Sequence, residues 1–325
     1  MTLAVLFSPQ GSQAVGMGAD LAAAWSSARG VYEEADAALS WSVSDVSWNG
    51  PDVRLNDTRQ TQPCLVATSL ACLAALRQAS AEAKVPFTPT LVAGHSVGEY
   101  AALAAAGVVS TADALRIVAR RGALMAEASE GGGMAAVIGL DRALVALVVA
   151  ATAPPEELVV ANDNAPGQVV ISGTTDALAR AEPALAKAGA RRVIALKVSG
   201  AFHSPLMAPV SIALARAFDE VHWSDAEPPL VSNVTGEPIR DAKVIRELLA
   251  RQVSSPVEWV ASVRRMVAEG VDTFVECGPG AALNGMVRRI ARRARILNVS
   301  DPATLRTTLA ALAEPARTAM AEASA

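Results

Sequence analysis

The hydrophobic residues of this 325-residue chain follow two spacings that alternate along its first part. Short apolar runs at 3–7 and 91–93 have the length and composition of buried strands. Longer runs at 62–78 and 112–128 are rich in alanine and leucine and have the length of helices. Because strands and helices alternate, we expect an α/β fold with a mostly parallel sheet.

A different pattern follows a cluster of three glycines. Its stretches read strand, helix, strand, strand, helix, strand, at 134–140, 142–151, 158–162, 168–172, 176–188 and 192–198. This order is that of a split βαβ unit, so we predict a small inserted ferredoxin-like α+β subdomain at 131–198. The α/β pattern then resumes with a strand at 272–276, and 1–130 and 199–325 are expected to form one large α/β domain. The alanine-rich tail after Pro315 predicts a frayed helix.

The strand-like run at 91–93 leads into a Gly-x-Ser-x-Gly pattern formed by Gly94, Ser96 and Gly98, and a helix-like run follows it. A nucleophile elbow requires this context, because the sharp strand-to-helix turn lifts the serine hydroxyl above the sheet. The helix N-terminus after the serine favours developing negative charge. We therefore predict a nucleophilic Ser96 in an α/β-hydrolase-like domain. The alternative is an ordinary turn with a helix-capping serine.

A nucleophilic serine needs a base, and the chain has only three histidines. His95 adjoins the serine, so its side chain is expected to point away from the elbow. His222 lies in a segment without a motif. His203 lies in a loop that follows the last strand of the predicted subdomain, and catalytic groups collect in such loops of α/β folds. His203 is therefore the favoured base.

Composition narrows the function further. Hydrophobic residues make up 52% of the chain and charged residues 18%, which provides for a large core. The formal net charge of −4 argues against binding to nucleic acid. We see no apolar run of membrane-spanning length and no signal sequence, and we expect a cytoplasmic protein. Its cysteines, Cys64, Cys72 and Cys277, predict buried free thiols, and no motif predicts a metal site or a phosphate-binding loop.

Several separated motifs together resemble the malonyl-CoA:acyl-carrier-protein transacylases of fatty-acid synthesis and the related acyltransferase domains of polyketide synthases. The resemblance covers nearly the whole chain, and no single motif would be specific enough alone. The motifs are Gln10-Gly11-Ser12-Gln13, Thr61-Gln62-Pro63, Gly94-His95-Ser96-Val97-Gly98-Glu99-Tyr100, Arg120-Arg121-Gly122, Asn164-Ala165-Pro166-Gly167-Gln168, Gly200-Ala201-Phe202-His203-Ser204 and Glu276-Cys277-Gly278-Pro279-Gly280.

The resemblance implies a catalytic role for five positions. Ser96 would carry the acyl group as an ester, and His203 would take the serine proton and return it to the leaving thiol. The backbone carbonyl of Gln252 would orient the histidine, which suits a neutral acceptor that fixes the tautomer. The backbone N–H groups of Gln10 and Val97 would form the oxyanion hole.

The resemblance also implies how the substrate is bound. Arg121 would bind the free carboxylate of a malonyl group through its planar guanidinium. The neighbouring Arg120 points elsewhere on a helix, so only one of the two can enter the site. Phe202 matches the malonyl-type form of the histidine loop. Gln62 and Asn162 match positions that line the substrate cleft.

One motif departs from the family. Relatives usually read Phe-Pro-Gly-Gln-Gly, whereas this chain reads Phe7-Ser8-Pro9-Gln10-Gly11. Proline fixes its own φ and restricts the residue before it, so the path into Gln10 can differ. We predict that the Gln10 N–H still points toward the site, because a φ near −65° is compatible with an extended approach to the loop.

The resemblance names malonyl-CoA and an acidic acyl carrier protein as partners and implies no cofactor, since the phosphopantetheine belongs to the carrier. The basic run at 287–295, with Arg288, Arg289 and Arg292, could dock that carrier or be a solvated helix face. We expect a monomer. Two other classes stay open: a serine hydrolase of esters or thioesters, and a non-catalytic carrier-binding module. Within the leading interpretation, a fatty-acid enzyme, a stand-alone polyketide acyltransferase and a malonate-decarboxylase subunit are not separated.

Overall fold

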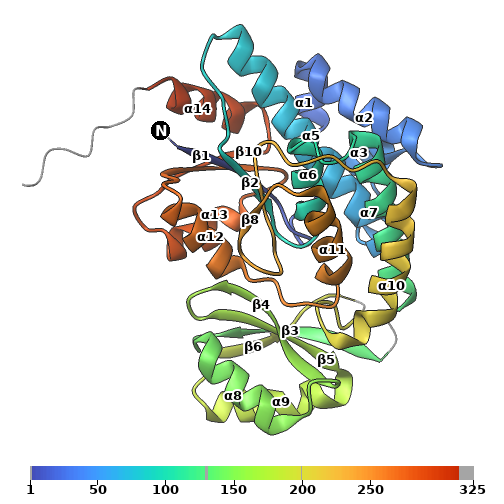
Figure 1. Ribbon diagram of the computed structural model, residues 1–325, viewed down its shortest axis with the longest axis vertical. Coiled ribbons are helices and arrows are strands. Elements are labelled where there is room, and N and C mark those ends of the chain that lie inside the picture. Colours follow the sequence, from blue (N-terminus) through green and yellow to red (C-terminus); the bar gives the residue numbers. More distant parts are fainter. Residues whose placement is uncertain (1, 129–130, 199, 315–325) are drawn as a thin grey trace, which may run out of the picture.

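The computed structural model describes residues 2–128, 131–198 and 200–314, which form two sheets with their helices (Figure 1). The larger sheet has six strands in the order β10-β9-β1-β2-β7-β8. All neighbouring strands in it are parallel except the last pair. Their bounds are β1 Leu3–Phe7, β2 Leu91–Gly94, β7 Leu230–Val231, β8 Pro238–Ile239, β9 Thr273–Cys277 and β10 Arg295–Val299. The α/β fold predicted from the sequence is confirmed.

The larger sheet is buried on both faces, as expected for parallel strands. Along β1, Leu3, Val5 and Phe7 join one apolar cluster, whereas Ala4 and Leu6 join another. The side chains alternate because successive residues of a strand point to opposite faces. The helices of this larger part are α1 Ala19–Ala24, α2 Ser26–Ala38, α3 Val43–Asn49, α4 Asp52–Leu55, α5 Thr58–Glu82, α6 Gly98–Ala105, α7 Thr111–Glu127, α10 Ala208–Ala217, α11 Ala242–Gln252, α12 Trp259–Ala268, α13 Ala282–Ile290 and α14 Pro302–Ala313.

Helix α5 corrects one expectation from the sequence. Its 25 residues are long and apolar enough, by length and composition, to cross a membrane. However, 78% of its most apolar window is buried inside the protein, where α2, α3, α6 and α7 pack against it. We therefore interpret it as the central core helix of the larger part.

The smaller sheet is antiparallel, with the order β4-β5-β3-β6. Its elements run β3 Gly132–Ile138, α8 Arg142–Thr152, β4 Leu158–Ala165, β5 Gln168–Thr174, α9 Thr175–Lys187 and β6 Arg192–Ala195, which is the predicted βαββαβ order. These elements have an apolar cluster of their own. Strand β4 runs three residues further than predicted and β6 ends three residues earlier. The tail after Pro315, for which we predicted a helix, lies outside the described residues.

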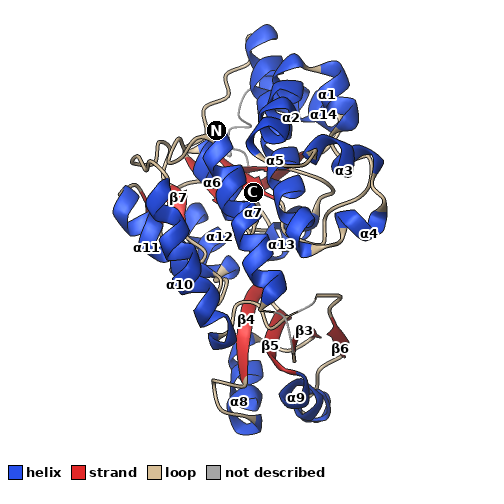
Figure 2. Ribbon diagram, turned by 90° about the vertical axis from the view of Figure 1, so that its right-hand side faces the viewer, coloured by secondary structure: helices blue, strands red, loops and turns tan. Residues whose placement is uncertain are grey.

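The smaller sheet lies at one end of the molecule in both views (Figures 1 and 2). Backbone hydrogen bonds join it to the larger part, because Asp163 donates to the Val257 carbonyl at 3.0 Å and Val257 donates to the Ala161 carbonyl at 2.8 Å. The Arg142 guanidinium on α8 also pairs with both carboxylate oxygens of Glu258, at the N-terminus of α12. Strand β4 is thereby fixed to the segment that leads into α12.

Candidate active site

Ser96 lies in a tight turn between β2 and α6. Its φ is 52°, in the left-handed region that a non-glycine residue adopts only when its surroundings hold it there. The flanking glycines are required by close contacts. A Cβ on Gly94 would lie 2.0 Å from the Gly98 carbonyl carbon, and a Cβ on Gly98 would lie 2.3 Å from the Phe7 carbonyl oxygen. The structure therefore has the strand-turn-helix geometry that the Gly-x-Ser-x-Gly pattern predicts.

Asn233, which the sequence analysis missed, holds this turn. Its Oδ1 accepts from the Ser96 backbone N–H at 2.6 Å, and its Nδ2 donates to the Gly94 carbonyl at 2.6 Å. The residue is fully buried and follows β7, whose two residues are too few for a strand signal in the sequence. The only available clue was its position among turn-forming residues at 232–236.

The structure brings Ser96 and His203 together, with 2.7 Å between Ser96 Oγ and His203 Nε2. On the other side of the ring, Nδ1 lies 3.0 Å from the Gln252 carbonyl oxygen and 3.1 Å from that of Ser255. Carbonyl oxygens only accept, so Nδ1 carries the proton and Nε2 is left to accept from the serine hydroxyl. The Gln252 carbonyl thus lies where the resemblance implied, and the Ser255 carbonyl is an addition.

His203 is kept neutral by its surroundings. Burial and the nearby Arg121 charge lower its pKa to about 3. Its φ of 58° is held by its own backbone N–H, which donates to the Val253 carbonyl at 2.9 Å. An imidazole that is neutral and fixed in one tautomer can accept a proton from the serine hydroxyl at neutral pH.

Arg121 on α7 is 1% exposed and reaches the same hydroxyl, with 3.2 Å between its Nη2 and Ser96 Oγ. Its Nη1 donates to Gln62 Oε1 at 2.7 Å, and its Nη2 also donates to Gln252 Oε1 at 3.1 Å. The guanidinium lies over the Tyr100 ring at 5.4 Å. Arg120 is exposed, as predicted. A cation that recognises carboxylates therefore lies beside the candidate nucleophile.

Ser96 and His203 face a cleft of about 620 Å3 between the two parts of the molecule. The cleft is mainly apolar, with polar groups from the Gln10 loop and from β4. Its lining includes Pro9, Gln10, Gly11, Gln13, Asn56, His95, Met125, Met134, Asn162, Asn164, Val170, Leu196, Lys197, Val198, Phe202 and Met286. Asn162 thus lines the cleft as expected. Gln62 is fully buried, and among the described residues it contacts Arg121 and Met125 rather than the cleft.

Two backbone N–H groups are free to serve as the oxyanion hole that the resemblance implies. Those of Gln10 and Val97 have no acceptor within residues 2–128, 131–198 and 200–314. The turn before Gln10 is anchored, since the buried Ser8 hydroxyl donates to Glu276 Oε1 at 3.1 Å. That the Gln10 N–H points toward the site, in spite of Pro9, stays a prediction.

The other two histidines differ from His203. His95 has other partners than Ser96: 2.7 Å separate its Nε2 from Asn164 Oδ1, and its ring meets Trp259 edge-on at 5.4 Å. Burial lowers the pKa of His95 to about 4. His222 makes one long contact with Ser224, at 3.4 Å. Among the described residues no cluster of three or more His, Cys, Asp or Glu side chains could hold a metal ion.

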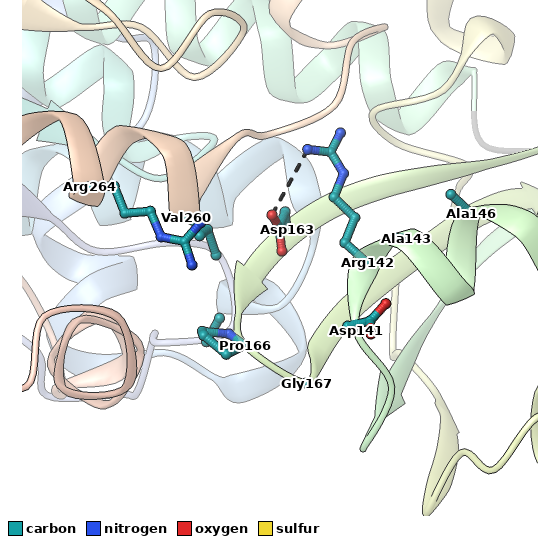
Figure 3. A pocket seen from close by; sticks show the side chains of 10 residues that line it. Asp141, Arg142, Ala143, Ala146, Asp163, Pro166, Gly167, Val260 and Arg264 are labelled. Atoms are coloured by element: carbon teal, nitrogen blue, oxygen red, sulfur yellow. Dashed lines mark ion pairs between the residues drawn. The ribbon is translucent and has the colours of Figure 1, made fainter.

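A second cavity, of about 450 Å3, lies on the other side of β4 (Figure 3). Asp163 faces it and lies 3.9 Å from Arg142, whereas the neighbouring Asn162 and Asn164 face the Ser96 cleft. Alternate residues of a strand point to opposite sides. This cavity is lined by Asp141, Arg142, Asp163 and Arg264 among others and shares no lining residue with the Ser96 cleft in the described part of the chain.

The basic run at 287–295 is not one helix face, which corrects one of the two interpretations. Helix α13 ends at Ile290, and Arg292 lies in the turn before β10. Arg289 donates to Gln168 Oε1 at 3.1 Å and to the Pro166 carbonyl, so it connects α13 to the turn between β4 and β5. Arg288 and Arg292 are exposed.

Comparison with known proteins agrees with the motifs. Residues 5–320 match the model of the acyl transferase domain family. The malonyl CoA-acyl carrier protein transacylase of Bacillus subtilis (strain 168) is 39% identical over 315 residues, or 96% of this chain and 98% of the relative. That of Salmonella typhimurium (strain LT2) is 41% identical over 304 residues, or 93% and 97%.

Solved structures show the same fold. The acyl carrier protein S-malonyltransferase from Vibrio cholerae O1 biovar eltor matches with a TM-score of 0.89 at 37% identity, covering 95% of this chain and 100% of that one. A malonyl-transacylase solved in complex with its type II PKS acyl-carrier protein matches with a TM-score of 0.90 at 37% identity, covering 96% of this chain and 100% of that one. With its motifs, its fold and these matches, the chain belongs to the malonyl CoA-acyl carrier protein transacylase family.

Proposed function

We propose that this protein is an [acyl-carrier-protein] S-malonyltransferase, which moves a malonyl group from malonyl-CoA to the phosphopantetheine thiol of an acyl carrier protein through an ester on Ser96. The observation that carries the proposal is the position of the Ser96 hydroxyl. It lies 2.7 Å from His203 Nε2 and 3.2 Å from Arg121 Nη2. An activated nucleophile and a carboxylate-binding cation are thus placed side by side.

The first half-reaction forms the ester. Ser96 Oγ attacks the thioester carbonyl carbon while His203 Nε2 takes the hydroxyl proton. The backbone N–H groups of Val97 and Gln10 are proposed to donate to the carbonyl oxygen as it gains negative charge. The carbon–sulfur bond then breaks, and His203 returns the proton to the sulfur of CoA.

The second half-reaction runs the same chemistry in reverse. The carrier thiol gives its proton to His203 and attacks the ester carbonyl carbon. The bond to Ser96 Oγ breaks, and the serine recovers the proton. Division into two steps of similar chemistry is the benefit of covalent catalysis. Throughout, Arg121 would hold the malonyl carboxylate, and Asn162 would line the path of the acyl donor.

We also propose a domain division, a location and a metabolic role for this protein. The elbow at Ser96 supports a hydrolase-like description of the large domain, 1–130 with 199–325, and the separate apolar cluster of the smaller sheet supports a subdomain at 131–198. The buried free thiols of Cys64, Cys72 and Cys277 suit a cytoplasmic location. The malonylated carrier could serve fatty-acid or polyketide synthesis.

The test is to incubate the protein with malonyl-CoA and a phosphopantetheinylated carrier and to follow both malonyl-carrier and free malonate by mass spectrometry. A transferase produces malonyl-carrier in proportion to the carrier supplied, with little free malonate. A serine hydrolase, the alternative function, would instead release malonate at a rate independent of the carrier. That result would overturn the proposal.

A further inference from the structure

We propose that Glu99 is a positioning residue for substrate selection, which fixes the orientation of the Gln252 side-chain amide and through it holds the Arg121 guanidinium ready for a carboxylate. The inference deepens the proposed function and rests on it, since it concerns how the acyl group is chosen. Glu99 lies on α6, is 2% exposed, and has no part in the proton transfers described above.

A continuous chain of hydrogen bonds connects Glu99 with Arg121. Glu99 Oε2 accepts from Gln252 Nε2 at 2.6 Å, and Gln252 Oε1 accepts from Arg121 Nη2 at 3.1 Å. Gln252 Nε2 also donates to the Ser96 carbonyl at 2.9 Å. The second carboxylate oxygen of Glu99 accepts from the Asn233 backbone N–H at 3.3 Å. Glu99, Gln252, Arg121 and Asn233 are all buried, so the chain from Glu99 to Arg121 is shielded from water.

The chemistry of these groups allows the amide of Gln252 only one orientation. An ionised carboxylate accepts hydrogen bonds and cannot donate them, so it must face the NH2 group of Gln252. The carbonyl oxygen of that amide must then face the guanidinium, which only donates. If the amide turned over, two donors would face each other at Arg121 and two acceptors would face each other at Glu99. Glu99 thus determines the orientation of a group that it touches, and that group holds Arg121.

The intervening amide also explains how Arg121 stays available. Among the described residues no carboxylate lies within 4.0 Å of its guanidinium, and the oxygens of Gln62 and Gln252 that it contacts are neutral. A carboxylate in direct contact would compete with the carboxylate of the substrate. A carboxylate one amide away still attracts the buried cation but does not itself form an ion pair with it.

The test compares Glu99→Gln with the unaltered protein. A glutamine at this position can donate as well as accept, so the Gln252 amide is no longer held in one orientation. Burial raises the pKa of Glu99 to about 7, so assays are run at about pH 8, where the carboxylate form predominates. The quantity measured is the kcat/KM of Ser96 acylation with malonyl-CoA and with acetyl-CoA, which has no free carboxylate.

We expect kcat/KM for malonyl-CoA to fall about 10- to 100-fold, mainly through KM, because a charge-assisted hydrogen bond is weakened. The value for acetyl-CoA should change by less than about 3-fold, because the reacting atoms are untouched. Equal losses for the two donors, or no loss for either, would show that Glu99 is only part of the fold of the elbow. Failure of the unaltered protein to accept malonyl at all would contradict the proposed function instead.

Glu276→Gln is the matched control. Glu276 is also a fully buried glutamate, and it accepts from Ser8 Oγ at 3.1 Å and from the Leu283 and Asn284 backbone N–H groups at 3.1 and 2.9 Å. It has no contact with Arg121 or Gln252 among the described residues, so any loss should be equal for the two donors. A malonyl-selective loss in Glu276→Gln would contradict the specific role of Glu99.

A second variant covers the case in which Glu99→Gln does not fold. Gln252→Met removes the amide but keeps the backbone carbonyl that faces His203, and it leaves Glu99 unaltered. It should lower kcat/KM for malonyl-CoA more than kcat/KM for acetyl-CoA, with some loss for both donors because the same amide donates to the Ser96 carbonyl. If Gln252→Met retains the full preference for malonyl over acetyl, the proposed chain from Glu99 to Arg121 does not set substrate choice.

Discussion

Gln252 serves two groups of the site at once. Its backbone carbonyl lies 3.0 Å from His203 Nδ1, and its side-chain oxygen accepts from Arg121 at 3.1 Å. The residue that orients the candidate base therefore also positions the cation that would bind the substrate carboxylate. At the scale of single residues, base orientation and substrate binding depend on the same position at the end of α11.

Arg121→Ala tests the role of that cation. Transfer of malonyl should be weakened by about 2–5 kcal/mol, because the lost contact is charge-assisted and buried. Transfer of acetyl should be weakened far less, since acetyl has no carboxylate for Arg121 to bind. The measurement is kcat/KM for both donors, with the exposed neighbour Arg120→Ala as the control for loss of charge on α7. Equal losses for both donors would show that Arg121 is structural.

The pH dependence tests the neutral state of His203. Its pKa in the folded protein is about 3, below the ordinary value of 6.5, because of burial and the Arg121 charge. Ser96 acylation by acetyl-CoA, which does not depend on the charge of Glu99, should therefore not decline with a pKa near 6.5 as the pH falls, and stopped-flow acylation rates will show this. A tenfold decline per pH unit below 6.5 would contradict the assignment.

The lowered pKa values of the two buried histidines also make the stability of the protein depend on pH. The unfolded chain binds protons at His95 and His203 below pH 6.5, whereas the folded chain resists them, since burial lowers the pKa of His95 to about 4. More protons bound in the unfolded state means that these two groups make the free energy of unfolding fall as the pH drops below 6.5. Urea unfolding across this range, compared with His95→Gln, measures the contribution of His95. The free energy of unfolding should change less steeply with pH in the variant. An equal pH dependence in the two proteins would contradict the lowered pKa of His95.

Ser96 and His203 could be found from the sequence because a motif or a loop position marked each of them. Asn233 and Glu99 could not be given roles in this way. Asn233 is 137 residues from Ser96 along the chain, and Glu99 meets Gln252 across 153 residues. Such contacts are defined by the folded backbone and leave no local spacing to detect. Gln62 shows the same limit, because its motif suggested cleft lining whereas its side chain is buried against Arg121.

At the scale of elements, the turn from β2 into α6 depends on the absence of side chains. Gly98→Ala should destabilise the protein by about 1–3 kcal/mol, because the new Cβ would meet the Phe7 carbonyl oxygen at 2.3 Å. Denaturant unfolding measures the change. Gly30→Ala on α2 is the control, because no atom lies within 4 Å of its Cβ, and it should leave stability unchanged or raise it by about 0.5–1 kcal/mol. Gly98→Ala with unchanged stability would contradict this account of the turn.

Pro9→Gly tests the turn before the predicted oxyanion hole. Ser8 is buried and held by Glu276, so the backbone path is anchored on the N-terminal side of Pro9. Replacing proline by glycine should therefore lower stability, through greater freedom of the unfolded chain, more than it alters the transfer rate. A variant much faster than the parent protein would show that Pro9 misaligns the Gln10 N–H, since one such donor is worth on the order of 3 kcal/mol in the transition state.

Element types were predictable from hydrophobic spacing, but their ends were not. The helix predicted at 62–78 runs from Thr58 to Glu82 in the structure. It begins earlier because the Asp57 side chain caps its first turn, and it ends later because tertiary packing stabilises its polar last turn. The basic run at 287–295 suggested one helix face, whereas the helix ends at Ile290 and the chain then turns into β10. Charge alone does not show where a helix stops.

At the scale of the whole molecule, the site lies at the carboxyl ends of adjacent parallel strands, where ligands bind in open α/β sheets. Phe7 and Gly94 are paired in register, so the Gln10 loop and Ser96 leave the sheet side by side. The strand order could not be predicted, because β7 has two residues and gives no periodic signal. The βαββαβ order of the smaller sheet could be predicted, because its strands are longer and succeed one another closely.

The basic run at 287–295 is the proposed docking surface for the carrier protein. Reversing the exposed Arg288 and Arg292 together to glutamate should raise KM for the carrier about 2- to 10-fold, since each exposed charge pair contributes about 0.2–1 kcal/mol. Acylation of Ser96 by malonyl-CoA should not change. The control is Arg306→Glu on α14, which lies away from the smaller sheet in Figure 1. An unchanged KM for the carrier would show that these arginines are a solvated face.

The central claim is that Ser96 carries the malonyl group, and intact-mass spectrometry after incubation with malonyl-CoA tests it most directly. The account predicts that the protein gains one malonyl group, that peptide mapping places it on Ser96, and that Ser96→Ala gains none. Malonyl labelling that persists in Ser96→Ala would contradict the account.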